Sequence, residues 1–129
     1  VAAATSGHDV VMAPNTYTYF DYYQSADRDA EPLAIGGYIP LEAAYAFEPV
    51  CEGIGDAYAH HVLGGQGQLW TEYIAAPEHA EYMAFPRLCA LAEVVWTPAE
   101  RRDYADFLAR LAVHLQRLDG LNVHYHPLE

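Results

Sequence analysis

The sequence predicts an α/β fold, namely the C-terminal portion, about the last two βα units, of a (β/α)8 TIM barrel. Two short segments predict parallel strands, because residues 9–13 form an apolar run that ends at a Pro-Asn pair and residues 67–72 follow a Gly-Gly pair. Aromatic and acidic residues stand at the carboxyl end of each strand, where the sites of such barrels lie. A complete barrel needs about 250 residues. The 129 residues of this chain are therefore expected to be incomplete on their own.

The segments around the two strands predict short helices and long loops. Residues 15–24 combine aromatic and polar side chains, a composition typical of functional loops. Residues 25–65 are irregular and contain one short helix candidate, 40–47, which begins with a proline. So long a connection indicates either a function or a larger body on which the loop lies. Residues 77–96 have helical apolar spacing interrupted by Pro86, which predicts two helices that meet there.

The last helix is predicted from an apolar stripe and from signals at both ends. It is expected to run over about residues 98–119. Thr97 and Glu100 have the spacing of a capping box at its start, and Gly120 stands where a left-handed cap belongs. The tail, residues 121–125, is a candidate for one more strand.

Composition excludes several classes of partner. Six basic residues, all of them arginine, and 18 acidic residues give a net charge of −12, which predicts no nucleic-acid partner and no anionic membrane partner. No segment approaches the roughly 18 apolar residues that span a bilayer. Cys51 and Cys89 fit no metal-binding spacing and are interpreted as buried or half-buried thiols, with a disulfide left open.

Two pairs of residues at the predicted strand ends could carry chemistry. They are Tyr19 with Asp21, and Trp70 with Glu72. In each pair an aromatic residue stands two positions before a carboxylate, so an extended chain points both side chains to one face. An aromatic face beside a hydrogen-bond acceptor suits a pyranose, whose C–H face packs on the ring while its hydroxyls donate to the acid. The alternative is a buried aromatic residue near a solvated acid in each case.

Longer blocks of sequence carry a family resemblance. The blocks are Gly7–Met12, Tyr19–Gln24, Glu31–Gly37, Leu69–Ile74, Tyr82–Leu88 and Ala90–Trp96. Together, and in this order, they closely resemble the family-20 glycoside hydrolases, the β-N-acetylhexosaminidases, over nearly the whole chain.

The resemblance implies a retaining exo-hydrolase that removes terminal N-acetylglucosamine or N-acetylgalactosamine. In this family the substrate's own 2-acetamido oxygen attacks the anomeric carbon. By the family's pattern Tyr19 is catalytic, because its hydroxyl holds the acetamido carbonyl for attack. Asp21 and Glu72 accept hydrogen bonds from sugar hydroxyls, and Trp70 forms the floor beneath the ring.

The family's catalytic Asp-Glu pair is missing, since the sequence contains no Asp-Glu dipeptide. Residues 1–129 are therefore expected to be a C-terminal fragment of a catalytic barrel, inactive alone, with the remainder of the barrel as a partner. The expected ligand is an N-acetylhexosamine-terminated oligosaccharide or glycoconjugate, with no cofactor and no metal. The compartment is left open, and the resemblance favours a periplasmic or secreted protein.

Two other functions remain open. One is a non-catalytic sugar-binding or interaction fragment, and the other is a stand-alone acidic α/β domain without a sugar site. Among the remaining polar residues, His60 and His61 are interpreted as solvated, because no third metal ligand stands at helical spacing. Arg87 and Glu93 are interpreted as forming an ion pair or helix-end contacts.

Overall fold

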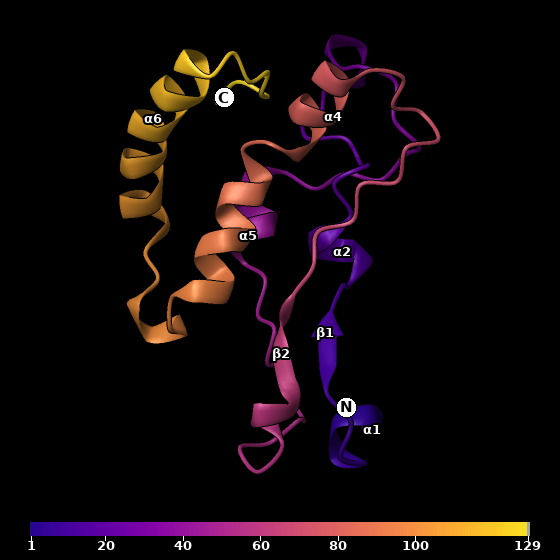
Figure 1. The fold of residues 1–129 in the computed structure, drawn as a ribbon, viewed down its shortest axis with the longest axis vertical. Helices are drawn as coiled ribbons and strands as arrows, with labels where there is room; N and C mark the ends of the chain where they lie inside the picture. The colour runs from indigo at the N-terminus through magenta and orange to yellow at the C-terminus, as the bar shows by residue number, and fades with distance from the viewer. Residues whose placement is uncertain (129) are drawn as a thin grey trace.

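A two-stranded parallel sheet lies in the lower half of the computed structural model as seen in Figure 1, near the N-terminus; the structure describes residues 1–128. Its strands are β1 (Val10–Met12) and β2 (Val62–Gly65), paired with Val10 opposite Val62 and Met12 opposite Gly65. The first strand agrees with the prediction. The second prediction, 67–72, is wrong, because regular pairing with the short β1 ends at Gly65 and only an isolated bridge at Gln68 follows.

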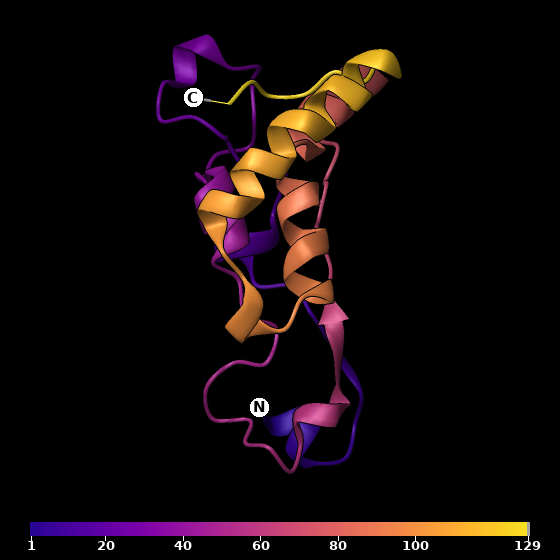
Figure 2. The ribbon, with the colours of Figure 1, turned by 90° about the vertical axis from the view of Figure 1, so that its left-hand side faces the viewer.

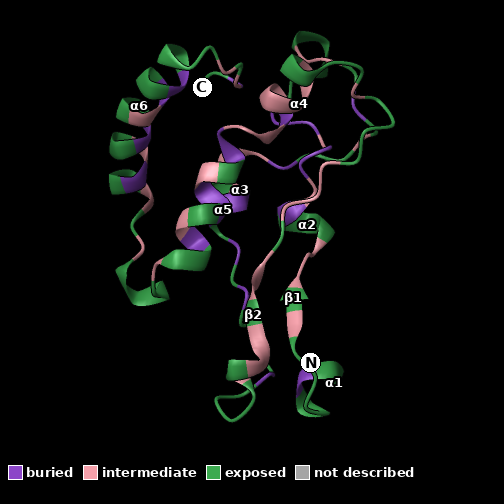
Figure 3. Cartoon of the chain, in the orientation of Figure 1, coloured by how far each residue is buried: buried purple, intermediate pink, exposed green. Residues whose placement is uncertain are grey.

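Both strands are more exposed than a buried parallel strand should be. Val11 is 52% exposed and Leu63 is 65% exposed, and the strands in Figure 3 carry only the colours of intermediate and exposed residues. The apolar run at residues 9–13 is typical of a strand that is buried on both faces, and that expectation is wrong for this chain. The reason is that, within residues 1–128, the sheet has no strand besides this pair, so its outer edges lack neighbours.

Residues 1–128 also form six α-helices and three 3₁₀ turns. The helices are α1 (Ala2–Thr5), α2 (Asn15–Thr18), α3 (Leu41–Tyr45), α4 (Pro77–Ala84), α5 (Arg87–Trp96) and α6 (Tyr104–Gly120). The turns are η1 (Arg28–Ala30), η2 (Ala59–His61) and η3 (Ala99–Arg101). The predicted short helix at 40–47 and the two helices that meet at Pro86 are confirmed.

The last helix begins later than predicted. Its N-cap is Asp103, whose carboxylate accepts the N–H of Asp106 at 3.0 Å, so the predicted capping box is wrong. Thr97 instead ends α5, where its carbonyl accepts a hydrogen bond from Arg102 at 2.9 Å. The chain turns between α5 and α6 through residues 97–103, so these residues are not available as the first turn of α6.

The end of the last helix also differs from the prediction. Gly120 is part of α6, and the residue with a left-handed backbone is Asn122, with φ of 56°. Residues 121–125 form no strand, because the tail instead runs back along α4. There the His124 N–H donates to the Glu81 carboxylate at 2.9 Å.

The core lies where α3, α5 and α6 meet, and α6 crosses beside α5 in Figure 2. Its buried members are Phe20, Ile39, Ala44, Tyr45, Phe47, Ala90, Leu91, Val94, Phe107, Leu111, Leu115 and Leu118. The last four form the buried face of α6, which confirms the predicted apolar stripe. The core therefore covers one side of the segment that contains Phe20.

One polar link joins the three core helices. The guanidinium of Arg110 donates to both carboxylate oxygens of Glu93, at 2.6 and 2.8 Å, and the Tyr45 hydroxyl donates to the same carboxylate at 3.0 Å. These bonds hold the pKa of Glu93 below its usual value, and the bond from Arg110 has the largest effect. Glu93 is thus a structural residue, as predicted, and its ion-pair partner is Arg110.

The remaining cysteine and histidine expectations are resolved by the geometry. Both cysteines are free, and burial raises the pKa of the Cys89 thiol to about 11. The His61 ring lies 2.9 Å from the Asp9 carboxylate. Over residues 1–128, no three His, Cys, Asp or Glu side chains are grouped so that they could hold a metal ion. The same residues include no helix with the length and apolarity needed to cross a membrane.

The open strand edges predict self-association of this chain in isolation. Unpaired backbone groups at sheet edges pair readily with other chains, and the exposed Val11 and Leu63 add apolar surface. We expect light scattering after size-exclusion chromatography to show a mass that rises with concentration, and we expect Val11→Lys to reduce that rise. A monomer that melts cooperatively at every concentration would contradict this expectation.

Candidate functional site

The two chain segments that follow the strands run side by side. Tyr19 and Gln68 form a parallel bridge, in which the Phe20 N–H donates to the Gln68 carbonyl and the Gln68 N–H donates to the Thr18 carbonyl, both at 2.7 Å. Because these segments leave the carboxyl ends of β1 and β2, the bridge extends their pairing beyond the sheet. It therefore brings the residues after Tyr19 close to those after Gln68.

A cavity of about 300 Å³ lies between these two segments. It is lined by Tyr19, Asp21, Tyr22, Ile35, Trp70 and Glu72. The four residues singled out in the sequence thus lie around one cavity, at the carboxyl ends of the strands. They range from buried Asp21, which is 4% exposed, to Trp70, which is 51% exposed, so the cavity has a buried floor and an open rim.

A larger hollow, of about 780 Å³, lies elsewhere in the molecule, between α5 and α6. Its lining is mostly apolar, and the one carboxylate in it, Glu93, is already bound to Arg110. The smaller cavity at the strand ends is therefore the better candidate for a ligand site. Its lining combines aromatic rings with two carboxylates, and neither of these is in an ion pair within residues 1–128.

Asp21 is the buried polar group of the cavity. Its Oδ1 has no hydrogen-bond donor among residues 1–128. Burial raises the pKa of the Asp21 carboxyl and the charge of Glu72 raises it further, while a backbone hydrogen bond and Arg87 act in the opposite direction. A buried oxygen without a donor is costly in the free protein. It is therefore suited to accept a hydrogen bond from a ligand.

Sequence reasoning missed two residues of the cavity. Tyr22 stands in the same aromatic run as Tyr19, and its ring packs edge-on against the Tyr19 ring at 5.7 Å. Ile35 comes from the long loop, which the sequence marked as functional without indicating which residue reaches the site. The proximity of Tyr22 to Asp21 was an available signal, whereas no local pattern distinguishes Ile35.

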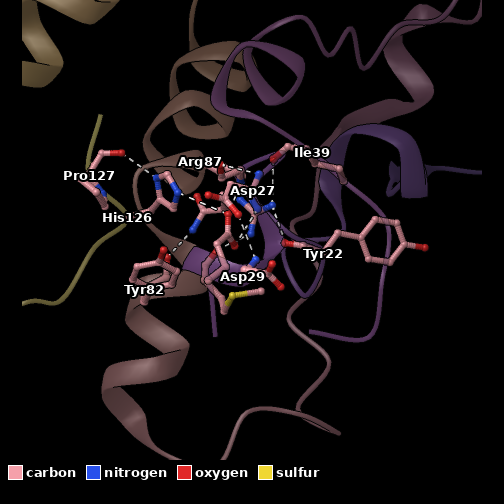
Figure 4. A network of polar contacts seen from close by, with 12 residues as sticks. Tyr22, Asp27, Asp29, Ile39, Tyr82, Arg87, His126 and Pro127 are labelled. Atoms are coloured by element: carbon pink, nitrogen blue, oxygen red, sulfur yellow. Dashed lines mark hydrogen bonds and ion pairs between the residues drawn. The ribbon is translucent and has the colours of Figure 1, made fainter. Parts of the chain in front are cut away.

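Arg87, the first residue of α5, is fully buried, and Figure 4 shows it within a network of polar contacts that includes Tyr22, a residue of the cavity lining. The hydrogen bonds of Arg87 within residues 1–128 go to backbone carbonyls, among them that of Met83 in the last turn of α4, so of the two predicted structural roles the helix-end contact is confirmed. Its side chain also reaches inward under the segment that contains Asp21.

The position of the Tyr22 ring depends on Gly37. The backbone of Gly37 has φ of 68°, and a Cβ there would overlap the Tyr22 ring. We expect Gly37→Ala to lower the free energy of unfolding by more than the roughly 1 kcal/mol of a left-handed alanine, and to change the near-ultraviolet circular dichroism of tyrosine. Gly55→Ala is the control, since Gly55 has a similar φ, of 73°, with open space around it. Equal effects of the two substitutions would contradict a role for the Tyr22 contact.

Comparisons with known proteins agree with this geometry. A model of the catalytic domain of glycosyl hydrolase family 20 matches residues 1–99. A beta-hexosaminidase of Porphyromonas gingivalis is 45% identical over 127 residues, and a beta-N-acetylhexosaminidase of Cellulomonas fimi is 35% identical over 126 residues. Each alignment covers 98% of this chain, but the chain spans only 16% and 25% of these two relatives.

Solved structures show the same relationship. The family-20 β-N-acetylhexosaminidase of Streptomyces coelicolor superposes with a TM-score of 0.85 at 31% identity, over 98% of this chain and 25% of that one. The family-20 exo-β-N-acetylglucosaminidase of Vibrio harveyi, solved with N-acetylglucosamine, gives a TM-score of 0.82 at 40% identity, over 96% of this chain and 20% of that one. The predicted fold class, part of a (β/α)8 barrel, is confirmed. The chain belongs to glycosyl hydrolase family 20 and corresponds to a part of its catalytic domain.

Proposed function

We propose that this chain is part of a retaining exo-β-N-acetylhexosaminidase and forms one wall of the pocket for the terminal N-acetylhexosamine. The observation that carries the proposal is that Tyr19, Asp21, Trp70 and Glu72 line a single cavity. The similarity to enzymes named beta-hexosaminidase and to a structure that holds N-acetylglucosamine supports it. A cavity of about 300 Å³ is small among ligand sites, as expected where one sugar ring is bound.

Each residue has a role in this proposal that its environment allows. Trp70 offers a large, half-exposed aromatic face on which the sugar ring packs. Asp21 accepts a hydroxyl at the buried end and Glu72 accepts one at the exposed rim. Tyr19, half-buried between them, donates its hydroxyl to the acetamido carbonyl.

The chemical contribution of Tyr19 is to orient the nucleophile. The acetamido oxygen attacks the anomeric carbon, and a fixed hydrogen bond to the acetamido group reduces the orientations that the group samples before attack. The Asp-Glu pair that assists the acetamido group and protonates the leaving oxygen is assigned to the rest of the complete enzyme, since this sequence has no such dipeptide.

The absence of that dipeptide favours a second candidate function, a fragment that binds sugar without hydrolysing it. The two functions share the pocket and differ in chemistry. They are separated by assaying the complete polypeptide and this chain on an aryl N-acetyl-β-glucosaminide, and by measuring N-acetylglucosamine binding for each.

Substituting Tyr19 tests the catalytic role. In the complete polypeptide we expect Tyr19→Phe to lower kcat on the aryl substrate about 100-fold, the usual effect of removing one positioned donor, with a smaller change in KM. Trp70→Ala is expected to raise KM and to weaken N-acetylglucosamine binding, because the stacking surface is lost. Tyr58→Phe, at an exposed tyrosine outside the cavity, is the control. Unchanged kinetics in both variants would refute the proposed roles, and sugar binding without hydrolysis in the wild type would support the second function.

The pH dependence of sugar binding tests Asp21. The ionised carboxylate accepts the hydroxyl, and its pKa is raised by burial, so affinity is expected to fall on acidification at a pH above the ordinary aspartate value of about 3.9. Asp21→Asn is expected to weaken binding and remove this dependence. Because burial disfavours the charged form, the same substitution is expected to raise the free energy of unfolding at neutral pH. Calorimetric titration with N-acetylglucosamine and urea denaturation measure the two effects, and a pH-dependent affinity that persists in Asp21→Asn would contradict the assignment.

A further inference from the structure

We infer that Arg87 is a positioning residue of the sugar pocket: its buried guanidinium holds the backbone on both sides of Asp21 and thereby sets where Asp21 and Tyr19 meet the sugar. The inference rests on the proposed function and extends it to a residue outside the cavity. Arg87 has no exposed surface and is not among the residues that line the cavity, so it acts through the chain that it holds.

The guanidinium of Arg87 joins three segments of the chain. One terminal nitrogen, Nη2, donates to the carbonyl of Phe20 at 2.6 Å and to that of Met83 at 2.7 Å. The other, Nη1, donates to the carbonyls of Tyr22 and Ile39, both at 3.0 Å, and Figure 4 shows these last two contacts. Phe20 and Tyr22 are the two neighbours of Asp21. One side chain therefore fixes the peptide group that precedes this acid and the one that follows Tyr22.

Only arginine can make this arrangement. Its planar guanidinium offers five N–H donors that point in fixed directions from separate nitrogens. The four acceptors divide into pairs, two on each terminal nitrogen. A lysine has one nitrogen with three hydrogens, which is fewer donors than the four acceptors require. The ring of Phe20, whose centroid lies 5.1 Å from the guanidinium carbon, covers the group further.

The charges around Arg87 are arranged to keep it ionised. Burial lowers its pKa to about 9, while Glu31 and Asp21 act against that effect, so the guanidinium is still protonated at neutral pH. The side chain of Glu31 is 1% exposed and accepts the backbone N–H groups of Gln24 and Ser25. Its carboxylate also lies 3.5 Å from the ring of His126. Glu31 thus connects the surroundings of Arg87 to the loop after Tyr22 and to the C-terminal tail.

Kinetics of the complete polypeptide test this inference. We expect Arg87→Lys to lower kcat/KM on the aryl N-acetyl-β-glucosaminide by about 10- to 100-fold, the effect of moving site groups by a fraction of an ångström to about one ångström. Arg102→Lys is the matched control, because Arg102 also donates to two backbone carbonyls, those of Thr97 at 2.9 Å and Phe47 at 3.3 Å, away from the cavity. It is expected to leave kcat/KM unchanged.

A double-mutant cycle separates positioning from general stability. If Arg87 acts through Asp21, the losses of N-acetylglucosamine affinity in Arg87→Lys and Asp21→Asn are less than additive when combined. Additive losses, or a lower Tm with unchanged kcat/KM in Arg87→Lys, would overturn the inference and leave the proposed function standing. Absence of hydrolysis in the wild-type polypeptide would overturn both.

A second variant covers the case in which Arg87→Lys does not fold. Arg87→Gln removes the buried charge and leaves one amide nitrogen with two hydrogens for the four carbonyls, so we expect kcat/KM to fall at least as far as in Arg87→Lys. A folded Arg87→Gln enzyme with unchanged kcat/KM and a lower Tm would show that Arg87 has a structural role alone, and would overturn the inference.

Discussion

The candidate site depends on the parallel pairing of two chain segments that are separated by about 50 residues of sequence. The pairing begins between β1 and β2 and continues, past the end of regular hydrogen bonding, through the bridge between Tyr19 and Gln68. Parallel strands place their carboxyl ends at one edge, which is why ligand sites of α/β folds collect there. Without this register, the aromatic and acidic pairs that follow the strands would not share one cavity.

Behind the cavity the structure replaces apolar packing with a buried cation. A buried charge is stabilised when its hydrogen-bond donors find acceptors. The two terminal nitrogens of Arg87 donate to four carbonyls, while its Nε has no acceptor among residues 1–128. The carbonyls of Phe20, Tyr22 and Ile39 belong to irregular segments that no sheet ladder would satisfy, and that of Met83 belongs to the last turn of α4. The same side chain therefore has two effects. It supplies donors to backbone carbonyls of the irregular segment, and it holds the backbone around Asp21 in place.

Several large apolar side chains of this chain are exposed, and the chain spans only a small part of the length of its relatives. Val11 and Leu63 on the strands are exposed, and Trp96 at the end of α5 is 89% exposed. Large apolar side chains at such exposure usually mark surfaces that contact other protein. The relatives are four to six times longer than the aligned segment, since it spans 16% to 25% of them.

Local patterns in the sequence determined the fold class, the helices that meet at Pro86, the buried face of α6 and the family, because each depends on residues close together in the chain. The sequence also named Tyr19, Asp21, Trp70 and Glu72 as the site, and the structure places all four around one cavity. Tertiary contacts decided the rest. The start of β2 follows from its pairing with β1, and the contact of Arg102 with Thr97 accompanies a helix start at Asp103. The entry of Ile35 into the cavity and the burial of Arg87 depend on loops that meet only in the folded chain, so no spacing in the sequence could reveal them.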